Sequence, residues 1–281
     1  MGSRMRVRLL GTGGAANEAR HQASLLVEWG EGSGAGRVLL DTGSGLDIVR
    51  LLISAGCEPA AVSDIFVSHQ HSDHVGGLEP LLLWSIITTL RAQGRPPSGE
   101  TRVYADRRIL AKIAALFETV GTAVPRLFGD KLRWIEAADG QSQELRSGGS
   151  LTAFLVDHEP MGGGAMGCVI ERDGTRLAYS GDTRPASRLI EAVRGVHVLV
   201  HEAGGLDAQA ADIHRQGHST AGDAGRVAAA AGVGRLILTH LPIDGLAEPM
   251  LAEARAAFGG PVELASDQAL IEISANITCP A

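Results

Sequence analysis

Short apolar runs recur along this 281-residue chain, and most of them end in glycine, aspartate or histidine. They are rich in valine, leucine and isoleucine and are bounded by turn-forming residues, a pattern typical of β-strands. The strands that we predict from this pattern span residues 6–14, 23–30, 37–45, 64–69, 102–105, 131–137, 151–159, 167–183 (a hairpin), 196–203, 235–240 and 262–266.

Longer segments between these runs have the length and apolar spacing of helices. A proline-containing break, GRPPSGE at 94–100, ends one of them, and Ser219 or Thr220 can cap the start of another. The helices that we predict span residues 48–56, 78–93, 107–120, 186–195, 219–232 and 251–258.

The order of these elements repeats, because the pattern of strands and helices restarts at Lys131. Two such halves predict an α/β fold, an αββα sandwich of two facing mixed β-sheets with helices on the outer faces. We expect a single domain over residues 5–281, since layered α/β folds reach this length as one unit. We expect residues 1–4 to be an addition ahead of a natural start at Met5.

Composition narrows the class of protein. A formal net charge of −7 disfavours nucleic acid as a partner, because duplex and tRNA binding draw on many Lys and Arg side chains. The three cysteines lack CxxC spacing, so they indicate neither a disulfide framework nor a thiolate zinc site and fit a cytoplasmic protein. We find neither a signal-peptide core nor an apolar run of membrane-spanning length, and we expect no membrane partner.

Three histidines and an aspartate crowd into HQHSDH, residues 69–74, at the end of an apolar run. Charging these imidazoles together would be costly, whereas their lone pairs suit a divalent metal. Further ligand-type residues follow other apolar runs, at His158, Asp182 and His240. We expect these side chains to meet at one rim of the sheets, and imidazole with carboxylate suits zinc, with manganese or iron as alternatives.

The motifs resemble those of the metallo-β-lactamase fold hydrolases. The resemblance extends over nearly the whole chain, through LGTGGAA, LLDTGSG, SHQHSDHVGGL, SGDTRP, VLVHEA, GHSTAGDAGRVA and LILTH. GHST and the final LTH narrow it to the branch that contains ribonuclease Z and its small-molecule relatives of phosphodiesterase or arylsulfatase type. The resemblance implies the αββα fold and a metal-dependent hydrolase.

The resemblance also implies a site for two divalent ions. Its ligands are His69, His71 and His158 on one ion, Asp73, His74 and His240 on the other, and Asp182 between them. His158 matches least well, because DHEPMGGGAMGCVI lacks the aromatic residue and arginine usual after that histidine. The alternative for His158 is a loop histidine with water completing the site, and the GGG run is a candidate substrate-side loop.

Catalytic roles follow from the same resemblance, for His218, Glu202 and Asp73. His218 matches a histidine that contacts the scissile phosphate and protonates the leaving group, and Glu202 is its orienting partner. A histidine so placed contributes a factor of about 10² to 10⁴ in rate. The alternative for His218 is a solvent-exposed residue before a helix. Asp41 resembles the aspartate that orients ligating histidines, with a simple turn residue as its alternative.

The remaining candidates carry weaker signals. We expect His197 and His201 to be packed strand residues, whereas His21 and His214 are loop histidines that could touch a substrate. We expect Trp84 to pack a helix against its neighbours, and the alternative is that it lines the mouth of the active site. The sequence GTGGAAN, residues 11–17, permits a tight turn near the substrate but is not a dinucleotide-binding motif.

The function that we expect is hydrolysis of a small phosphodiester, such as a cyclic nucleotide, through a metal-bridging hydroxide. Only a short hairpin separates His158 from Asp182, where tRNA 3′-processing enzymes of this branch usually carry a long arm. Ribonuclease Z-like processing therefore ranks lower, and an ester, lactone, sulfate ester or β-lactam remains an alternative substrate for the same metals. A metal-holding scaffold is a third reading. The expected partner is a small anionic molecule, and a homodimer is left open.

Overall fold

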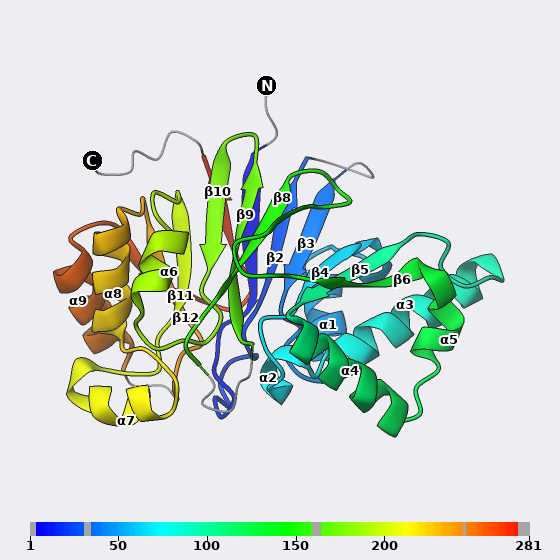
Figure 1. Cartoon of the computed structure of the whole chain (residues 1–281), viewed down its shortest axis with the longest axis horizontal. Helices are drawn as coiled ribbons and strands as arrows, with labels where there is room; N and C mark the ends of the chain where they lie inside the picture. The colour runs from blue at the N-terminus through cyan, green and yellow to red at the C-terminus, as the bar shows by residue number, and fades with distance from the viewer. Residues whose placement is uncertain (1–3, 31–34, 159–163, 244–245, 275–281) are drawn as a thin grey trace.

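The computed structural model describes residues 4–30, 35–158, 164–243 and 246–274. Within these ranges the chain forms two seven-stranded sheets that face each other. Helices cover the outer face of each sheet, and the start of β1 and the end of β14 lie at the edge opposite α2 and α7 (Figure 1). The predicted αββα sandwich is confirmed.

The first sheet combines an antiparallel and a parallel half. Strands β14, β1, β2 and β3 pair antiparallel, and β3 to β6 pair parallel. Its strand order is β14 (Ala269–Ile273), β1 (Met5–Gly11), β2 (Ser24–Trp29), β3 (Gly36–Leu40), β4 (Asp64–Phe66), β5 (Thr101–Ala105) and β6 (Leu132–Glu136).

The second sheet has the same division. Strands β7 to β10 pair antiparallel, and β10 to β13 pair parallel. Its strand order is β13 (Val262–Leu264), β12 (Leu236–Thr239), β11 (Val198–Glu202), β10 (Thr175–Tyr179), β9 (Met166–Arg172), β8 (Ser150–Leu155) and β7 (Ser142–Glu144).

Side-chain alternation along the strands builds the core in three layers. In β11, Val198 and Val200 join the cluster between the two sheets, whereas Leu199 joins the cluster under the helices. Because successive side chains point to opposite faces, a strand buried on both faces must be apolar throughout, as VLV is. Apolar packing on both faces stabilises the sheets, and the loops at their edges are anchored at the strand ends.

Helices pack on the outer faces, with α1, α3, α4 and α5 on the first sheet and α6, α8 and α9 on the second (Figure 1). In the described part of the chain, short 3₁₀ turns cover Pro59–Ala61, Gly129–Lys131 and Asp207–Gln209. The helices span α1 (Asp47–Ser54), α2 (Ser72–Val75), α3 (Leu78–Gln93), α4 (Arg107–Thr119), α5 (Val124–Phe128), α6 (Ser187–Ala192), α7 (Ala210–Arg215), α8 (Ala221–Ala231) and α9 (Ala247–Phe258).

Helix α8 shows how local sequence sets an element boundary beside the site. Thr220 Oγ1 accepts a hydrogen bond from the backbone N of Asp223 at 3.0 Å, and the Asp223 carboxylate accepts one from the backbone N of Thr220 at 3.0 Å. These reciprocal bonds satisfy two amides that a helix start leaves unpaired. Helix α8 therefore begins at a fixed point, immediately after His218 and Ser219.

Several elements differ from the predicted set. Strands β7 and β14 and helices α2, α5 and α7 were not predicted, and β14 returns the end of the described chain to β1 in the first sheet. The other predicted elements occur, most of them with bounds that differ by a few residues: β1 ends at Gly11 rather than at residue 14, and α9 begins at Ala247 rather than at residue 251. Among the described residues, every helix is too short or too polar to cross a lipid bilayer.

Candidate metal centre

Loops that carry the candidate ligands all leave the sandwich at one edge. His69 and His71 follow β4, His158 follows β8, Asp182 follows β10 and His240 follows β12. Strands β8, β10 and β12 run in the same direction within the second sheet, because β9 is antiparallel to both β8 and β10 and the remaining pairs are parallel. Their carboxyl ends therefore deliver these side chains to the same place.

The HQHSDH segment divides its side chains by a change of backbone conformation. His71 has extended φ and ψ angles and precedes the single turn of α2, which contains Asp73 and His74. The loop after β3 holds this turn, since both the backbone N and the Oγ1 of Thr42 donate to the carbonyl of His74, at 2.7 and 2.9 Å. The short helix α2 therefore separates the histidines at positions 69 and 71 from the pair at 73 and 74.

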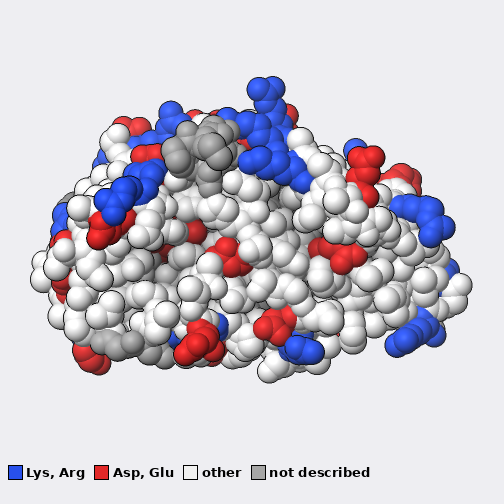
Figure 2. Space-filling model, turned by 90° about the horizontal axis from the view of Figure 1, so that it is seen from below, with Lys and Arg blue, Asp and Glu red and all other residues white. Residues whose placement is uncertain are grey.

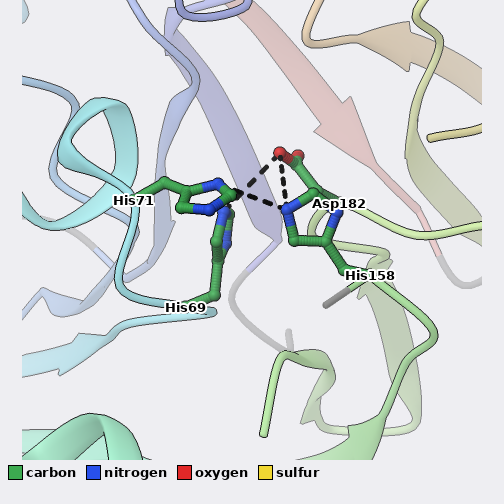
Figure 3. Close-up of side chains that lie close together, drawn as sticks. All are labelled: His69, His71, His158 and Asp182. Carbon is green, nitrogen blue, oxygen red and sulfur yellow. Dashed lines mark hydrogen bonds and ion pairs between the residues drawn. The ribbon is translucent and has the colours of Figure 1, made fainter. Parts of the chain in front are cut away.

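One group of potential ligands consists of His69, His71, His158 and Asp182, whose nitrogen and oxygen atoms lie within 4.8 Å of one another. Figure 3 shows the three imidazoles and the carboxylate pointing toward a common centre. His158 Nε2 is 3.3 Å from His71 Nδ1, and His69 Nε2 is 3.7 Å from Asp182 Oδ2.

A second group consists of Asp73, His74 and His240. Asp73 Oδ2 lies 3.3 Å from His240 Nε2 and 3.4 Å from His74 Nε2. Asp182 Oδ2 is 3.3 Å from His74 Nε2 and 3.4 Å from His240 Nε2, so the same carboxylate borders both groups. A third grouping of Asp182, His218 and His240 overlaps the second.

Some polar atoms of these two groups have no hydrogen-bond partner, as expected of atoms that bind a cation. His69 Nε2 and Asp182 Oδ1 are buried and have no hydrogen-bond partner among the described residues. Buried polar atoms are rarely left unpaired, because their desolvation then costs free energy without compensation. Nitrogen and oxygen donors that converge in this way suit one or more divalent ions, and no thiolate belongs to either group.

Protonation states at the site also suit metal binding, which needs neutral imidazole and ionised carboxylate. Burial lowers the pKa of His69 well below its ordinary value and also lowers that of His158. Burial raises the pKa of Asp182, but the charges of His240 and His74 outweigh it and hold that pKa well below the ordinary value. His74 is the exception, since Asp182 and Asp41 overcome its burial and raise its pKa.

Asp41 lies next to the ligand groups and accepts hydrogen bonds from three side chains. Its Oδ2 accepts hydrogen bonds from His74 Nδ1 at 2.7 Å, from the Ser68 hydroxyl at 2.7 Å and from the Tyr179 hydroxyl at 2.8 Å. Because Nδ1 of His74 is bound to Asp41, Nε2 is the nitrogen turned to the site. The supporting position predicted for Asp41 is what the structure shows.

Sequence reasoning missed Ser68 and Tyr179 as partners of Asp41. Tyr179 ends β10 in the opposite sheet, and burial raises the pKa of its hydroxyl well above the ordinary value. Its pattern signal is a tyrosine at the end of a strand, on the inner face that it shares with Leu177 and just before SGDT. A buried tyrosine needs a partner for its hydroxyl, and this need is the signal that could have been followed.

His218 and Glu202 form a pair at the margin of the centre. His218 Nδ1 lies 3.1 Å from Glu202 Oε1 and 3.9 Å from Asp182 Oδ2. Glu202 is fully buried, and its Oε1 also accepts hydrogen bonds from the backbone N of Thr183 and of Ser219. Burial lowers the pKa of His218, but the Glu202 carboxylate more than offsets this and raises it to about 9 without bound metal.

A pocket of about 340 Å³ opens beside His218 and His240. Its remaining lining comes from residues 14–17, Gly204, Gln216 and residues 241–243, none of which carries a charge. Gly14 contacts the ring of His240, where an added Cβ would lie 3.1 Å from Cε1. The predicted approach of the GTGGAAN turn to the substrate region is therefore consistent with the structure.

The face that contains these loops is not basic. Figure 2 views the molecule from this side, with Lys and Arg mainly toward the periphery and scattered Asp and Glu nearer the middle. A separate cavity of about 190 Å³ lies between α3 and the start of β5 and is lined by none of the candidate ligands. The chemistry-bearing residues are therefore associated with the uncharged pocket beside His218.

The other candidates lie outside the centre. His201 is buried and its Nδ1 donates to the carbonyl of Glu202, while His197 is half-buried at the turn before β11. His21 pairs with Asp47, and His214 Nε2 contacts Asp223 at 2.6 Å.

Neither His21 nor His214 lines the pocket beside His218, as far as the described residues show. Trp84 packs against the cluster under the first sheet. Most of the GGG segment lies outside the described residues.

Comparisons with known proteins agree with this geometry. Residues 36–241 match the family model of the beta-lactamase superfamily domain. Ribonuclease Z from Pyrobaculum calidifontis is 33% identical over 261 residues, which cover 83% of this chain and 85% of that protein.

Solved structures show the same fold. The metallo-beta-lactamase fold protein YhfI from Bacillus subtilis superposes with a TM-score of 0.80 at 23% identity, covering 96% of this chain and 99% of that one. A diphosphatase of the PhnP family superposes with a TM-score of 0.72 at 19% identity, covering 97% and 98% of the two chains. At these identities the likeness establishes the architecture alone.

Proposed function

The chain belongs to the family of beta-lactamase superfamily domains, and on that premise we propose that it hydrolyses a small phosphodiester with two divalent metal ions. The observation that carries the proposal is the His218–Glu202 pair, which stands beside both ligand groups and borders the uncharged pocket. An anionic group held at the metals would meet His218 on one side and the pocket on the other.

The proposed ligand sets follow the two groups of side chains. His69, His71 and His158 would hold one ion, Asp73, His74 and His240 the other, and Asp182 both. Zinc is the proposed ion, since imidazole and carboxylate donors suit it, with manganese or iron as alternatives. Two bound ions would supply Lewis acidity that makes water more acidic and polarises the phosphoryl oxygens.

His218 is proposed to give a proton to the leaving oxygen. Its Nδ1–H donates to Glu202, so Nε2 is the nitrogen available to a group in the pocket. Glu202 cannot turn away readily, because two backbone amides bind the same oxygen. The fixed carboxylate therefore holds the imidazole in one tautomer and favours its protonated form before transfer.

Asp73 is proposed to contribute charge as a ligand. Burial raises its pKa, but hydrogen bonds from His240 and His74 outweigh this and hold the pKa well below the ordinary range. An ionised Asp73 and an ionised Asp182 together offset part of the charge of two divalent ions. The remaining positive charge favours an anionic substrate such as a phosphodiester.

The pocket favours a small substrate with an uncharged organic group. Its volume of about 340 Å³ is at the lower end of ordinary ligand sites, and apart from His218 and His240 the described lining residues are uncharged. From residue 164 to Asp182 the chain forms the β9–β10 hairpin, whose second strand ends at Tyr179. Neither feature offers the extended cationic surface that tRNA binding requires.

RNA 3′ processing is the second candidate, because the 33% identical relative is a ribonuclease Z. The diphosphatase of the PhnP family shares the fold and acts on a phosphate-containing substrate by its name. The 33% identical relative supports phosphoester chemistry over acyl chemistry. The mostly uncharged pocket and the acidic net charge support a small phosphodiester over RNA.

Metal removal tests the proposal. We expect chelator-treated protein to lose hydrolysis of bis-p-nitrophenyl phosphate and to regain it on addition of zinc or manganese, with about two ions per chain by elemental analysis. Undiminished hydrolysis by protein shown to be metal-free would contradict the proposal, as would full activity with a single ion per chain.

A further inference from the structure

Arg184 binds the segment that carries His158. It lies two residues after Asp182, and its Nη1 donates to the carbonyl of His158 at 3.2 Å and to that of Asp157 at 3.4 Å. Its Nη1 also pairs with the Asp157 carboxylate at 3.1 Å, and its backbone N donates to the Asp157 carbonyl at 2.7 Å. Most of these contacts are to main-chain atoms, so they fix the path of the chain at His158.

The same guanidinium binds a second segment, which leads to His218. Its Nε donates to the carbonyl of His214 at 2.5 Å, and its Nη2 donates to that of Arg215 at 3.5 Å. Both carbonyls belong to the end of α7, three and four residues before His218. Arg184 therefore joins two segments that are far apart in the sequence.

The two segments meet inside the metal centre. His158 Nδ1 donates to the carbonyl of Gly217 at 2.8 Å, and the ring centroids of His158 and His218 are 5.0 Å apart. Gly217 has φ of +93°, and a Cβ there would lie 2.4 Å from the carbonyl O of His158. Any change in the separation of these segments must therefore move both rings.

We propose that Arg184 is a positioning residue, which sets the spacing between His158 and His218 and so holds His158 in the geometry that binds metal. The roles of His158 as a ligand and of His218 as an acid rest on the proposed function. The contacts of Arg184 themselves do not, since they involve only the chain. Gly217 orients the ring of His158 by accepting a hydrogen bond from its Nδ1. Arg184 binds the backbone at His158 and at His214, and so fixes the two segments that this hydrogen bond joins.

Arginine is the residue type that this position requires. Its planar group carries donors along more than one edge, and here these serve carbonyls on opposite sides. A lysine ammonium is a compact charge on a flexible stem and cannot bridge both segments at once. Arg184→Lys therefore keeps the charge and removes the bridge.

The test measures metal affinity, using the whole chain. Arg184→Lys and Arg184→Ala are compared with wild type and with Arg188→Ala, an exposed arginine on α6 that pairs with Asp139. Zinc is titrated against a competing chelator so that the two binding steps are separated. We expect one step to weaken about 10- to 100-fold in both Arg184 variants, the other to stay within about threefold, and Arg188→Ala to match wild type.

Rescue separates positioning from general support of the fold. Guanidinium chloride at low millimolar concentration should restore the weakened step in Arg184→Ala, and sodium chloride at equal ionic strength should not. If Arg184→Ala does not fold, the selective loss in Arg184→Lys carries the test, with unfolding temperatures measured for every variant.

Two results would overturn the inference. One is wild-type affinity for both ions in a folded Arg184→Lys protein. The other is equal weakening of both steps without rescue. If wild type binds two ions but cleaves no phosphodiester, the proposed function fails while these affinities still decide the role of Arg184. A wild type that binds no ion at His158 contradicts both.

Discussion

His218 is the side chain on which the proposed reaction depends most. Glu202 binds its Nδ1, and its ring stacks on that of His240 with centroids 5.3 Å apart. It also belongs to a group with Asp182 and His240 that could hold a metal, so its role as an acid must be separated from a role as a ligand.

Replacement of His218 by alanine separates the two roles. We expect His218→Ala to keep about two ions per chain and to lose a factor of about 10² to 10⁴ in kcat, because the proton donor is gone while the proposed ligands stay. His21→Ala is the matched control, since this exposed histidine pairs with Asp47 outside the centre. Loss of an ion from His218→Ala would instead identify His218 as a ligand.

At the residue scale the sequence predicts which candidate ligands lie close together, but it does not predict all the residues that support them. HQHSDH, His158, Asp182 and His240 converge as predicted, because each directly follows an apolar run. Their assignment as ligands stays a prediction. Ser68 and Tyr179 support them by binding Asp41, and Gly217 by binding His158, through hydrogen bonds between distant segments. Such contacts depend on the packed arrangement and leave little trace in local pattern.

The start of α8 is the element boundary on which the position of His218 depends. Asp223 closes the cap with Thr220 and also pairs with His214 and Arg226. Burial raises the pKa of Asp223, but the hydrogen bonds from His214, Arg226 and Thr220 outweigh it and lower the pKa to about 2. The ionised carboxylate is therefore the form that stabilises the folded chain.

The pH dependence of stability tests this cap. The pKa of Asp223 is depressed on folding, so its stabilisation is full above about pH 4 and is lost as pH falls toward 2. We expect Asp223→Ala to lower the free energy of unfolding by about 1 kcal/mol at pH 6. The difference in unfolding temperature between the variant and wild type should narrow between pH 4 and pH 2.5. A difference independent of pH would refute this account of the cap.

At the element scale, prediction succeeds where a segment is long or strongly apolar. Helix α3 has the length and apolar density of a helix, α4 has amphipathic spacing, and β11 begins with a continuous apolar run, so each can be assigned from its own sequence. Helix α2 is four residues long and owes its turn to hydrogen bonds with Thr42. Strand β14 alternates buried and exposed residues over only five positions and is defined by pairing with β1, more than 250 residues away.

At the scale of the whole molecule, the residues proposed to carry the reaction lie at one edge of the two sheets. Residues from β4, β8, β10, β11 and β12 reach this edge only because both sheets direct those strands toward it. The repeated order of elements was enough to predict two facing sheets. The shape and neutrality of the pocket were not predictable, because they depend on how the 14–17 turn, Gln216 and residues 241–243 come together.

The central claim is that the molecule prefers a small phosphodiester, and a panel of substrates on metal-replete protein tests it most directly. The panel contains bis-p-nitrophenyl phosphate, cyclic nucleotides, a precursor tRNA, an aryl sulfate, a lactone and a chromogenic cephalosporin. We predict that kcat/KM is highest for one of the small phosphodiesters. A higher value for the precursor tRNA, the aryl sulfate or either acyl substrate would contradict the account.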